Sequence, residues 1–333
     1  MKKNIPLVPL ILASQLLSGQ VVAEDVSIAI HGGAGTLKRE HMSPQQEAVY
    51  RQKLEEAVTL GHTLLKQGKS AVEAVTETIK ILEDSPLFNA GRGAVYTYNG
   101  EHELDASIMD GKDRAAGAVA GVKHVKNPIT LARLIMEKSD HVFLSGDGAE
   151  QFAWLHDIER ASTGYFDNEQ RYKQLLDVKE KLAFQQISPV HTDYKFGTVG
   201  AVARDSQGNL AAATSTGGMT AKRYGRIGDS PVIGAGNFAD NQSCAVSATG
   251  HGEFFIRYNV AADICARVRY QNIDAKTAAD TVINQVLKEA GGEGGVIVVD
   301  SKGAVSMPFN TSGMYRASID TKGKLTVGIF AGE

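Results

Sequence analysis

The sequence predicts a layered α/β protein. Segments with the alternating or continuous apolar pattern of strands are followed by segments with the apolar period of helices, and the connections between them are short. Of the 333 residues, 43% are hydrophobic and 22% are charged. This composition supports a sizeable buried core and excludes disordered and fibrous proteins.

The first elements follow from apolar runs and capping signals. A predicted strand over 26–30 runs into the glycine-rich segment 31–35, which we expect to form a tight turn near the functional site. No G-K-[ST] or G-x-G-x-x-G pattern is present there, so a nucleotide site is not indicated. Ser43-Pro44-Gln45-Gln46 has the pattern of a capping box with proline at the first helical position and predicts a helix to about residue 67. Ser70 caps a second predicted helix over 71–83.

The middle of the chain alternates in the same way. Residues 87–96 read as a loop that enters a strand, Asn99-Gly100 as a hairpin turn, and 103–109 as the returning strand. The pattern then predicts three further elements, a strand over 115–122, a helix over 129–136 and a strand over 141–144.

The character of the chain changes between about 162 and 196. Residues 169–183 are charged with a helical pattern, whereas 185–194 are polar, contain Pro189 and show no apolar period. We expect an exposed linker that ends where a β-hairpin over 198–216 begins.

The C-terminal part completes the alternation. Short strands are predicted over 232–236 and 243–248, followed by a helix over 254–270 and by a second helix that Asp274 caps. The chain is then predicted to end in three strands, over 295–299, 304–307 and 325–330.

Charge and cysteine content narrow the functional classes. A net charge of -3 and the lack of a basic patch argue against nucleic acid as a partner. Cys244 and Cys265 have no metal-binding spacing. They could pair in an oxidising compartment, but Cys265 lies in an apolar helical stretch, so we expect two buried free thiols.

The first residues have the pattern of an export signal. Lys2-Lys3 is followed by an apolar run over 5–17 and by Val21-Val22-Ala23, a small-residue cleavage site before Glu24. The run is too short to span a bilayer, for which about 20 residues are needed. We expect residues 1–23 to be a removed signal peptide, which places a bacterial protein in the periplasm; the alternative is an uncleaved membrane anchor.

The Gly197-Thr198 bond at the head of the predicted hairpin is the most informative chemical feature. If the chain were cut there, Thr198 would carry a hydroxyl nucleophile and an α-amine. Such an amine titrates at about 7.7–8.0 and can act as the hydroxyl's own base. Taken alone, Gly-Thr is far more often an ordinary strand start.

Four blocks in order make the chain resemble the plant-type L-asparaginases, also called isoaspartyl peptidases or β-aspartyl-peptidases, which are N-terminal nucleophile hydrolases. The blocks are GTVG at 197–200, TSTGGMT at 214–220, GRIGDSP at 225–231 and TGHGE at 249–253. The N-terminal half agrees through 31–35 and 89–91.

The resemblance implies a four-layer αββα sandwich that forms one structural domain and cleaves itself before Thr198. The products would be an α subunit, 24–197, which ends in a polar linker from about 185, and a β subunit, 198–333, assembled as a dimer of αβ pairs. The implied reaction is hydrolysis of the β-amide of L-asparagine and of the isopeptide bond of β-aspartyl dipeptides, releasing L-aspartate. No catalytic cofactor is implied; a loop between Leu82 and Arg92 matches one that binds a structural sodium.

Carried over by position, the resemblance also implies the catalytic groups. Thr198 is the nucleophile, and the hydroxyl of Thr216 helps to hold and activate its amine. Thr249, through its hydroxyl, and Gly250, through its N–H, form the oxyanion hole. Asn89 matches the family's site asparagine.

The same resemblance makes Arg226 the ligand of the substrate α-carboxylate and Asp229 the ligand of its α-ammonium, with Gly252 lining the amine pocket. A free aspartyl head carries both charges on one carbon, so its site needs one cation and one anion close together, and arginine suits bidentate contact with a carboxylate. His251 is not expected to be the base, because the α-amine fills that role.

Three alternatives stay open at the level of the sequence. A glycosylasparaginase would use the same nucleophile on sugar-linked asparagine, and a threonine endopeptidase that cuts after aspartate belongs to the same fold. An exported solute-binding protein for acidic amino acids would use Arg226 and Asp229 as its clamp and leave Thr198 inert. The preference between asparagine and isoaspartyl dipeptides is likewise not fixed by the residues.

Overall fold

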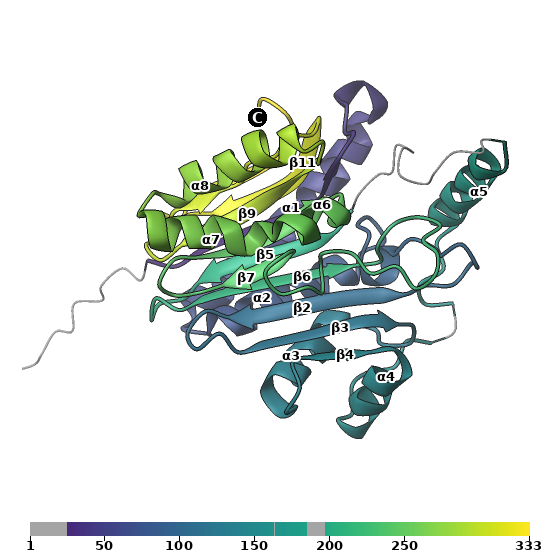
Figure 1. Cartoon of the computed structure of the whole chain (residues 1–333), viewed down its shortest axis with the longest axis horizontal. Helices are drawn as coiled ribbons and strands as arrows, with labels where there is room; N and C mark the ends of the chain where they lie inside the picture. The colour runs from purple at the N-terminus through teal and green to yellow at the C-terminus, as the bar shows by residue number, and fades with distance from the viewer. Residues whose placement is uncertain (1–24, 163, 185–196) are drawn as a thin grey trace, which may run out of the picture.

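The computed structural model describes residues 25–162, 164–184 and 197–333, which form two facing sheets covered by helices on both outer sides (Figure 1). The large sheet is antiparallel except for its last pair, which is parallel. In sheet order its strands are β12 (Leu325–Phe330), β11 (Gly313–Ile319), β1 (Ser27–Gly35), β5 (Val199–Arg204), β6 (Leu210–Thr216), β2 (Leu104–Asp110), β3 (Ala116–Val122) and β4 (Phe143–Ser145).

The small sheet is antiparallel and faces β1, β5, β6 and β2 of the large one. Its order is β10 (Val305–Ser306), β9 (Gly294–Asp300), β8 (Cys244–Gly250) and β7 (Asn237–Ala239). Apolar side chains such as Val202, Ala212 and Ile297 fill the space between the sheets. This central layer fixes β5, which starts next to the predicted cleavage point, against β8.

Helices cover each outer face through apolar stripes. The large sheet carries α1 (Pro44–Lys66), α2 (Ala71–Glu83) and α3 (Pro128–Lys138). The small sheet carries α7 (Val260–Gln271), which follows α6 (Gly252–Tyr258), and α8 (Ala275–Thr281), which continues into the π-helical turn η4 (Val282–Leu287). Two further helices, α4 (Gly146–Leu155) and α5 (Glu169–Phe184), follow β4. The four-layer αββα arrangement is therefore present.

Several predicted elements are confirmed. Ser43 caps α1 with a complete capping box, in which Gln46 N–H donates to the Ser43 hydroxyl at 3.2 Å and Ser43 N–H to the Gln46 side chain at 3.1 Å. Ser70 caps α2, and the hairpin over 198–216 forms as β5 and β6. The charged segment 169–183 is α5.

The glycine-rich segment 31–35 is not the turn that we predicted. It stays inside β1 and pairs with β11, with a register shift between His31 and Gly33. The missing side chain at Gly32 lets the Phe88 ring approach, since a Cβ there would lie 2.4 Å from that ring. Glycine here serves close packing instead of chain reversal.

Other strand boundaries also differ from the prediction. Residues 87–96 do not enter a strand but form a compact loop around the short helix η2 (Gly91–Gly93). Segment 232–236 is a turn, and the strand follows it as β7. At the end of the chain four strands form instead of three, because β11 was missed; its mixed sequence, GMYRASI, hides a strand that is buried between β1 and β12.

The helix predicted over 254–270 is two helices, α6 and α7. Asn259 separates them with a φ of 51°, a left-handed value that asparagine tolerates better than most residues. The break redirects the chain, so that α7 lies on β7 and β8 while α6 stays next to the end of β8.

The prediction of free thiols is wrong, because Cys244 on β8 and Cys265 on α7 form a disulfide with a Cα–Cα separation of 5.4 Å. Both side chains are buried. The apolar surroundings of Cys265 were read correctly, but sequence periodicity could not show that α7 packs directly on β8.

Two predictions concern residues that the structure does not describe. The signal segment 1–23 and nearly all of the linker, 185–196, lie outside the described residues. Within 25–162, 164–184 and 197–333, none of the helices combines the length and apolar character that a bilayer crossing requires.

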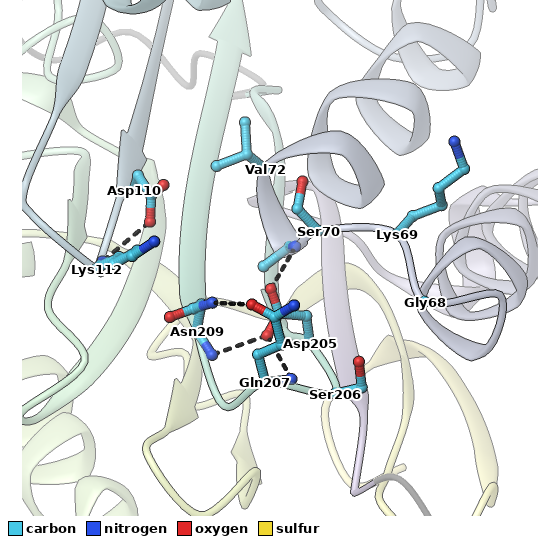
Figure 2. Close-up of a pocket in the computed structure, with 11 residues that line it drawn as sticks. Gly68, Lys69, Ser70, Val72, Asp110, Lys112, Asp205, Ser206, Gln207 and Asn209 are labelled. Carbon is cyan, nitrogen blue, oxygen red and sulfur yellow. Dashed lines mark hydrogen bonds between the residues drawn. The ribbon is translucent and has the colours of Figure 1, made fainter.

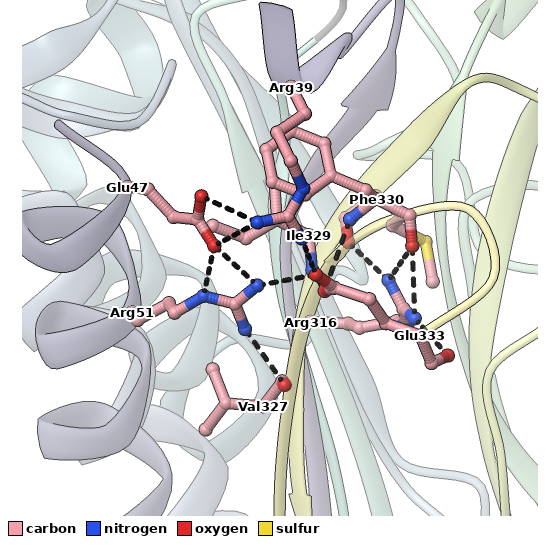
Figure 3. Close-up of polar contacts among 9 residues, drawn as sticks. Arg39, Glu47, Arg51, Arg316, Val327, Ile329, Phe330 and Glu333 are labelled. Carbon is pink, nitrogen blue, oxygen red and sulfur yellow. Dashed lines mark hydrogen bonds and ion pairs between the residues drawn. The ribbon is translucent and has the colours of Figure 1, made fainter. Parts of the chain in front are cut away.

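Arginine side chains attach the edge strand β12 to α1 (Figure 3). Arg51 donates to the Val327 carbonyl at 3.1 Å and pairs with the Glu333 carboxylate at 2.7 Å. The buried Arg316 donates to the backbone oxygen of Glu333 at 2.8 Å. These contacts hold the rim of the large sheet.

A second polar feature is a small hollow of about 200 Å³ between the β5–β6 turn and the start of α2 (Figure 2). Asp205 organises it, because its carboxylate accepts hydrogen bonds from the N–H groups of Ala71 at 3.1 Å, Gln207 at 3.0 Å and Asn209 at 2.8 Å. The carboxylate therefore serves the hairpin turn and the first turn of α2 at once.

The first prediction concerns Asp205→Ala. The variant should lower the free energy of unfolding by about 1–3 kcal/mol, because the buried N–H group of Ala71 loses its acceptor. Urea denaturation measures the change. Ser206→Ala, which removes none of these bonds, is the matched control; equal stability of the two variants would contradict the role of Asp205.

Candidate active site

Thr198 lies directly before β5 and is almost fully buried, with 8% of its surface exposed. Its hydroxyl donates to the Thr216 hydroxyl at 3.0 Å. Thr216 in turn accepts from the N–H of Gly218 at 3.0 Å and approaches the carbonyl oxygen of Gly197 at 3.5 Å. The side chain of Thr216 therefore connects the predicted nucleophile to the carbonyl that self-cleavage would attack.

A buried histidine, His31, contacts the backbone of Thr198. His31 Nδ1 lies 2.8 Å from the Thr198 carbonyl oxygen, and its Nε2 lies 3.0 Å from the Ser247 hydroxyl. Burial lowers the pKa of His31 to about 3, against the hydrogen bond to Thr198, which raises it. The ring is therefore neutral, Nδ1–H donates to the carbonyl, and Nε2 accepts from Ser247.

This contact requires glycine at position 200. Gly200 is opposite His31 in the β1–β5 register, and a Cβ there would lie 2.2 Å from His31 Nε2 and 2.1 Å from the Ser247 hydroxyl. The signature glycine thus makes room for the histidine. The role of His31 was not predicted, because the glycines after it indicated a turn; its position directly after an apolar strand was a signal in the sequence that pointed to a buried histidine.

Asn89 lies in the predicted α subunit and contacts the loop after β6. Its side-chain N–H donates to the Gly218 carbonyl at 2.7 Å, and its side-chain oxygen accepts from the N–H of Val95 at 2.9 Å. A Cβ on Gly197 would lie 2.9 Å from the Asn89 Cβ, so the two backbones are in close contact. Asn89 therefore adjoins the predicted cleavage point.

Thr249 and Gly250 end β8, on the facing sheet. The Thr249 hydroxyl is buried and accepts from the N–H of Ala34 on β1 at 3.3 Å. Gly250 has a φ of 154°, and a Cβ there would lie 2.4 Å from the Glu293 carbonyl oxygen. Only glycine fits this strand end.

Arg226 and Asp229 lie beside Gly252, where α6 begins. A Cβ on Gly252 would lie 2.8 Å from an oxygen of Asp229 and 2.9 Å from Nη2 of Arg226, so both charged groups approach the same point. Among the described residues, Asp229 Oδ2 has no hydrogen-bond partner although it is buried. Burial raises the pKa of Asp229 to about 7, while the Arg226 charge opposes the shift. A buried carboxyl group with one oxygen left without a hydrogen-bond partner among the described residues can accept a hydrogen bond from a ligand ammonium.

Strand β8 relates these groups to one another. Ser247 on this strand contacts His31, which in turn contacts Thr198. The strand ends with Thr249 and Gly250, and Gly252, two residues later, lies beside Arg226 and Asp229. The structure thus brings Gly197, Thr198, Thr216 and Asn89 together on one side and Arg226, Asp229 and Gly252 together on the other.

The loop between Leu82 and Arg92 is folded tightly enough to gather carbonyl oxygens. A Cβ on Gly91 would lie 2.4 Å from the Glu83 oxygen, and one on Gly93 would lie 2.0 Å from the Phe88 oxygen and 2.8 Å from the Pro86 oxygen. Hard cations prefer oxygen ligands, so these carbonyls are the groups that would hold a sodium, and the Phe88 oxygen also accepts from the N–H of Ala90. Over the described ranges, histidine, cysteine and acidic side chains form no metal-binding group.

Comparison with known proteins places this geometry in a family. A family model described as Asparaginase matches residues 24–329. The isoaspartyl peptidase of Salmonella typhimurium is 52% identical over 293 residues, which cover 87% of this chain and 94% of that protein. The isoaspartyl peptidase of Escherichia coli is 51% identical over 87% of this chain and 91% of its own length. The isoaspartyl peptidase/L-asparaginase of Bos taurus is 42% identical over 92% and 96%.

The second prediction concerns the buried carboxyl of Asp229. Its folded pKa, about 7, lies above the ordinary value of 3.8, so the native state favours the protonated form and loses stability as pH rises from about 4 to 7. Asp229→Asn does not titrate at this position. The free energy of unfolding of the variant minus that of the wild type should therefore be larger at pH 7.5 than at pH 5, by on the order of 2 kcal/mol.

Urea denaturation of both proteins at the two pH values measures this gain. Asp147→Asn, at an exposed position, is the control and should show no such gain. A difference between wild type and Asp229→Asn that stays constant with pH would show that Asp229 is ionised in the folded protein throughout this range.

Proposed function

This chain belongs to the asparaginase family, and on that premise we propose that it hydrolyses the β-amide of L-asparagine and the isopeptide bond of β-aspartyl dipeptides, releasing L-aspartate. The relatives named above are isoaspartyl peptidases, one of them also an L-asparaginase. The observation that carries the proposal is the hydrogen bond from Thr198 to Thr216, made beside the Gly197 carbonyl.

The chain first cleaves itself in this proposal. The Thr198 hydroxyl oxygen bonds to the Gly197 carbonyl carbon, the C–N bond breaks, and the nitrogen takes the hydroxyl proton and becomes the α-amine. Water then opens the resulting ester. The products are an α subunit, 24–197, with a new carboxylate, and a β subunit, 198–333, that begins with Thr198.

Turnover repeats the same acyl transfer with a substrate. The freed amine takes the Thr198 hydroxyl proton, the oxygen attacks the substrate β-carbonyl, and ammonia or an amino acid leaves with a proton. Water hydrolyses the aspartyl ester and regenerates Thr198. The Thr216 hydroxyl accepts a hydrogen bond from the Thr198 hydroxyl at 3.0 Å and so holds the Thr198 hydroxyl in position for both stages.

The remaining groups bind the substrate and its developing charge. Arg226 takes the α-carboxylate and Asp229 the α-ammonium, whose charge restores ionisation of that buried carboxyl. The Thr249 hydroxyl and the Gly250 N–H stabilise the oxyanion; loss of one such donor typically costs about 2.7–4 kcal/mol. Asn89, through Gly218, keeps the loop after Thr216 in place.

Rivals with the same nucleophile differ in the leaving group. Purified protein tested with β-aspartyl-leucine and with glycosylated asparagine separates an isoaspartyl peptidase from a glycosylasparaginase. Two fragments that meet at Gly197 and Thr198 in the mass spectrum exclude an inert solute-binding protein. A dimer of αβ pairs and a structural sodium held by carbonyls of the loop between Leu82 and Arg92 belong to the same proposal.

Export belongs to the proposal as well. The pattern of residues 1–23 supports removal of a signal peptide, and the Cys244–Cys265 disulfide supports an oxidising compartment such as the periplasm.

The third prediction tests the nucleophile. Thr198→Ala should stay a single uncut chain and release no ammonia from asparagine, because it lacks the attacking hydroxyl. Denaturing electrophoresis and an ammonia assay measure both results. Thr97→Ala, at a buried threonine on the loop after η2, is the control and should still be processed. Two fragments from Thr198→Ala would refute the mechanism.

The fourth prediction tests export. Expressed with its N-terminus intact in a bacterium, the protein should fractionate with the periplasm, begin at Glu24 and contain no free thiol after denaturation without reductant. N-terminal sequencing and thiol titration measure this. A cytoplasmic protein that begins at residue 1 would contradict export while leaving the hydrolase proposal intact.

A further inference from the structure

Glu253, in the first turn of α6, contacts the predicted substrate clamp directly. Its two carboxylate oxygens accept from Arg226 Nε at 3.0 Å and from Nη2 at 3.0 Å. His251 Nε2 lies 3.2 Å from the same carboxylate. The Arg226 side chain is 18% exposed and that of Glu253 is 46% exposed, so solvent reaches both partners. The family resemblance gave this glutamate no role.

The geometry of the pair determines which part of the guanidinium remains available. A guanidinium has a side edge, formed by Nε and one terminal nitrogen, and an end edge, formed by its two terminal nitrogens. Glu253 occupies the side edge. This leaves Nη1 and the second N–H of Nη2, which form the end edge, without a hydrogen bond to Glu253. The backbones of Gly228 and Gly252 lie near these nitrogens, since a Cβ on Gly228 would lie 2.8 Å from Nη1 and one on Gly252 would lie 2.9 Å from Nη2. The end edge therefore keeps N–H groups that can donate to a ligand carboxylate.

The charges of the pocket also depend on Glu253. Apart from His251, which contacts Glu253, and with Asp229 ionised, Arg226 supplies one positive charge against the two carboxylates of Asp229 and Glu253, which leaves one excess negative charge. A ligand carboxylate that arrives without a cation increases this excess, whereas an aspartyl head brings its own ammonium and leaves it unchanged. Since Asp229 is buried and its Oδ2 has no partner among the described residues, the ammonium has a defined place to bind.

We propose that Glu253 is a positioning and specificity-determining residue. It holds Arg226 by the side edge so that the end edge faces the ligand, and it cancels the Arg226 charge so that the pocket selects carboxylates whose neighbouring carbon carries an ammonium. The inference rests on the proposed function, because it takes Arg226 and Asp229 as the clamp.

The fifth prediction compares L-aspartate with succinate, which has the same two carboxylates but no ammonium. Isothermal titration calorimetry gives both dissociation constants for the processed wild type, Glu253→Gln and Glu253→Asp. Because removal of one nearby charge favours succinate relative to aspartate, the ratio of the succinate to the aspartate constant should fall about fivefold to tenfold in Glu253→Gln.

Glu253→Asp keeps the charge but shortens the side chain. It should therefore weaken the binding of both ligands and keep the ratio of the succinate to the aspartate constant within about twofold of the wild type. Glu137→Gln removes the partner of Arg133 on α3, an exposed pair away from the clamp, and should change neither constant. Thermal melting checks that each variant is folded.

The outcomes separate the two proposals. One outcome would overturn the role of Glu253 alone: the wild type releases ammonia from asparagine and binds aspartate, but Glu253→Gln leaves the ratio unchanged. Loss of a merely structural residue would weaken the binding of both ligands equally and so would not change the ratio. A wild type that binds neither ligand would overturn the clamp, and with it this inference.

Discussion

The structure depends on one constraint. Thr198 lies at the start of the buried central strand β5, and the strands on both sides of β5 contact Thr198. On one side, His31 on β1 donates to the Thr198 carbonyl; on the other, Thr216 on β6 accepts from the Thr198 hydroxyl. Because β5 pairs with both strands, the register of the sheet places His31 and Thr216 on either side of Thr198. The hydroxyl that we propose as the nucleophile is thereby held by Thr216, which also lies near the Gly197 carbonyl.

The small sheet contributes the strand β8, which supports His31 and leads to the charged residues of the site. Across the sandwich, β8 supports His31 through Ser247 and then ends in Thr249 and Gly250, directly before the charged residues around Gly252. One strand therefore connects the proposed nucleophile with the proposed substrate clamp. The Cys244–Cys265 disulfide links the start of this strand covalently to α7.

Glycines contribute to this site mainly by leaving space for other residues. Gly200 makes room for His31 and Ser247, Gly252 for Arg226 and Asp229, and Gly32 for Phe88. At each position an added Cβ would lie within 3 Å of a functional or core side chain. The glycine-rich signature blocks are thus explained by packing around polar groups, with chain reversal a lesser part of their use.

The sequence by itself determined the layered α/β class, the capped helices, the hairpin at Thr198 and the residue types of the site, because these follow from local periodicity, capping chemistry and short motifs. It could not place β11, the break at Asn259 or the Cys244–Cys265 pair, since each depends on which elements pack together. The contacts of His31 with Thr198 and of Glu253 with Arg226 join residues 167 and 27 positions apart. Only the tertiary structure decided them, because hydrogen bonds between distant residues leave no periodic trace in the chain.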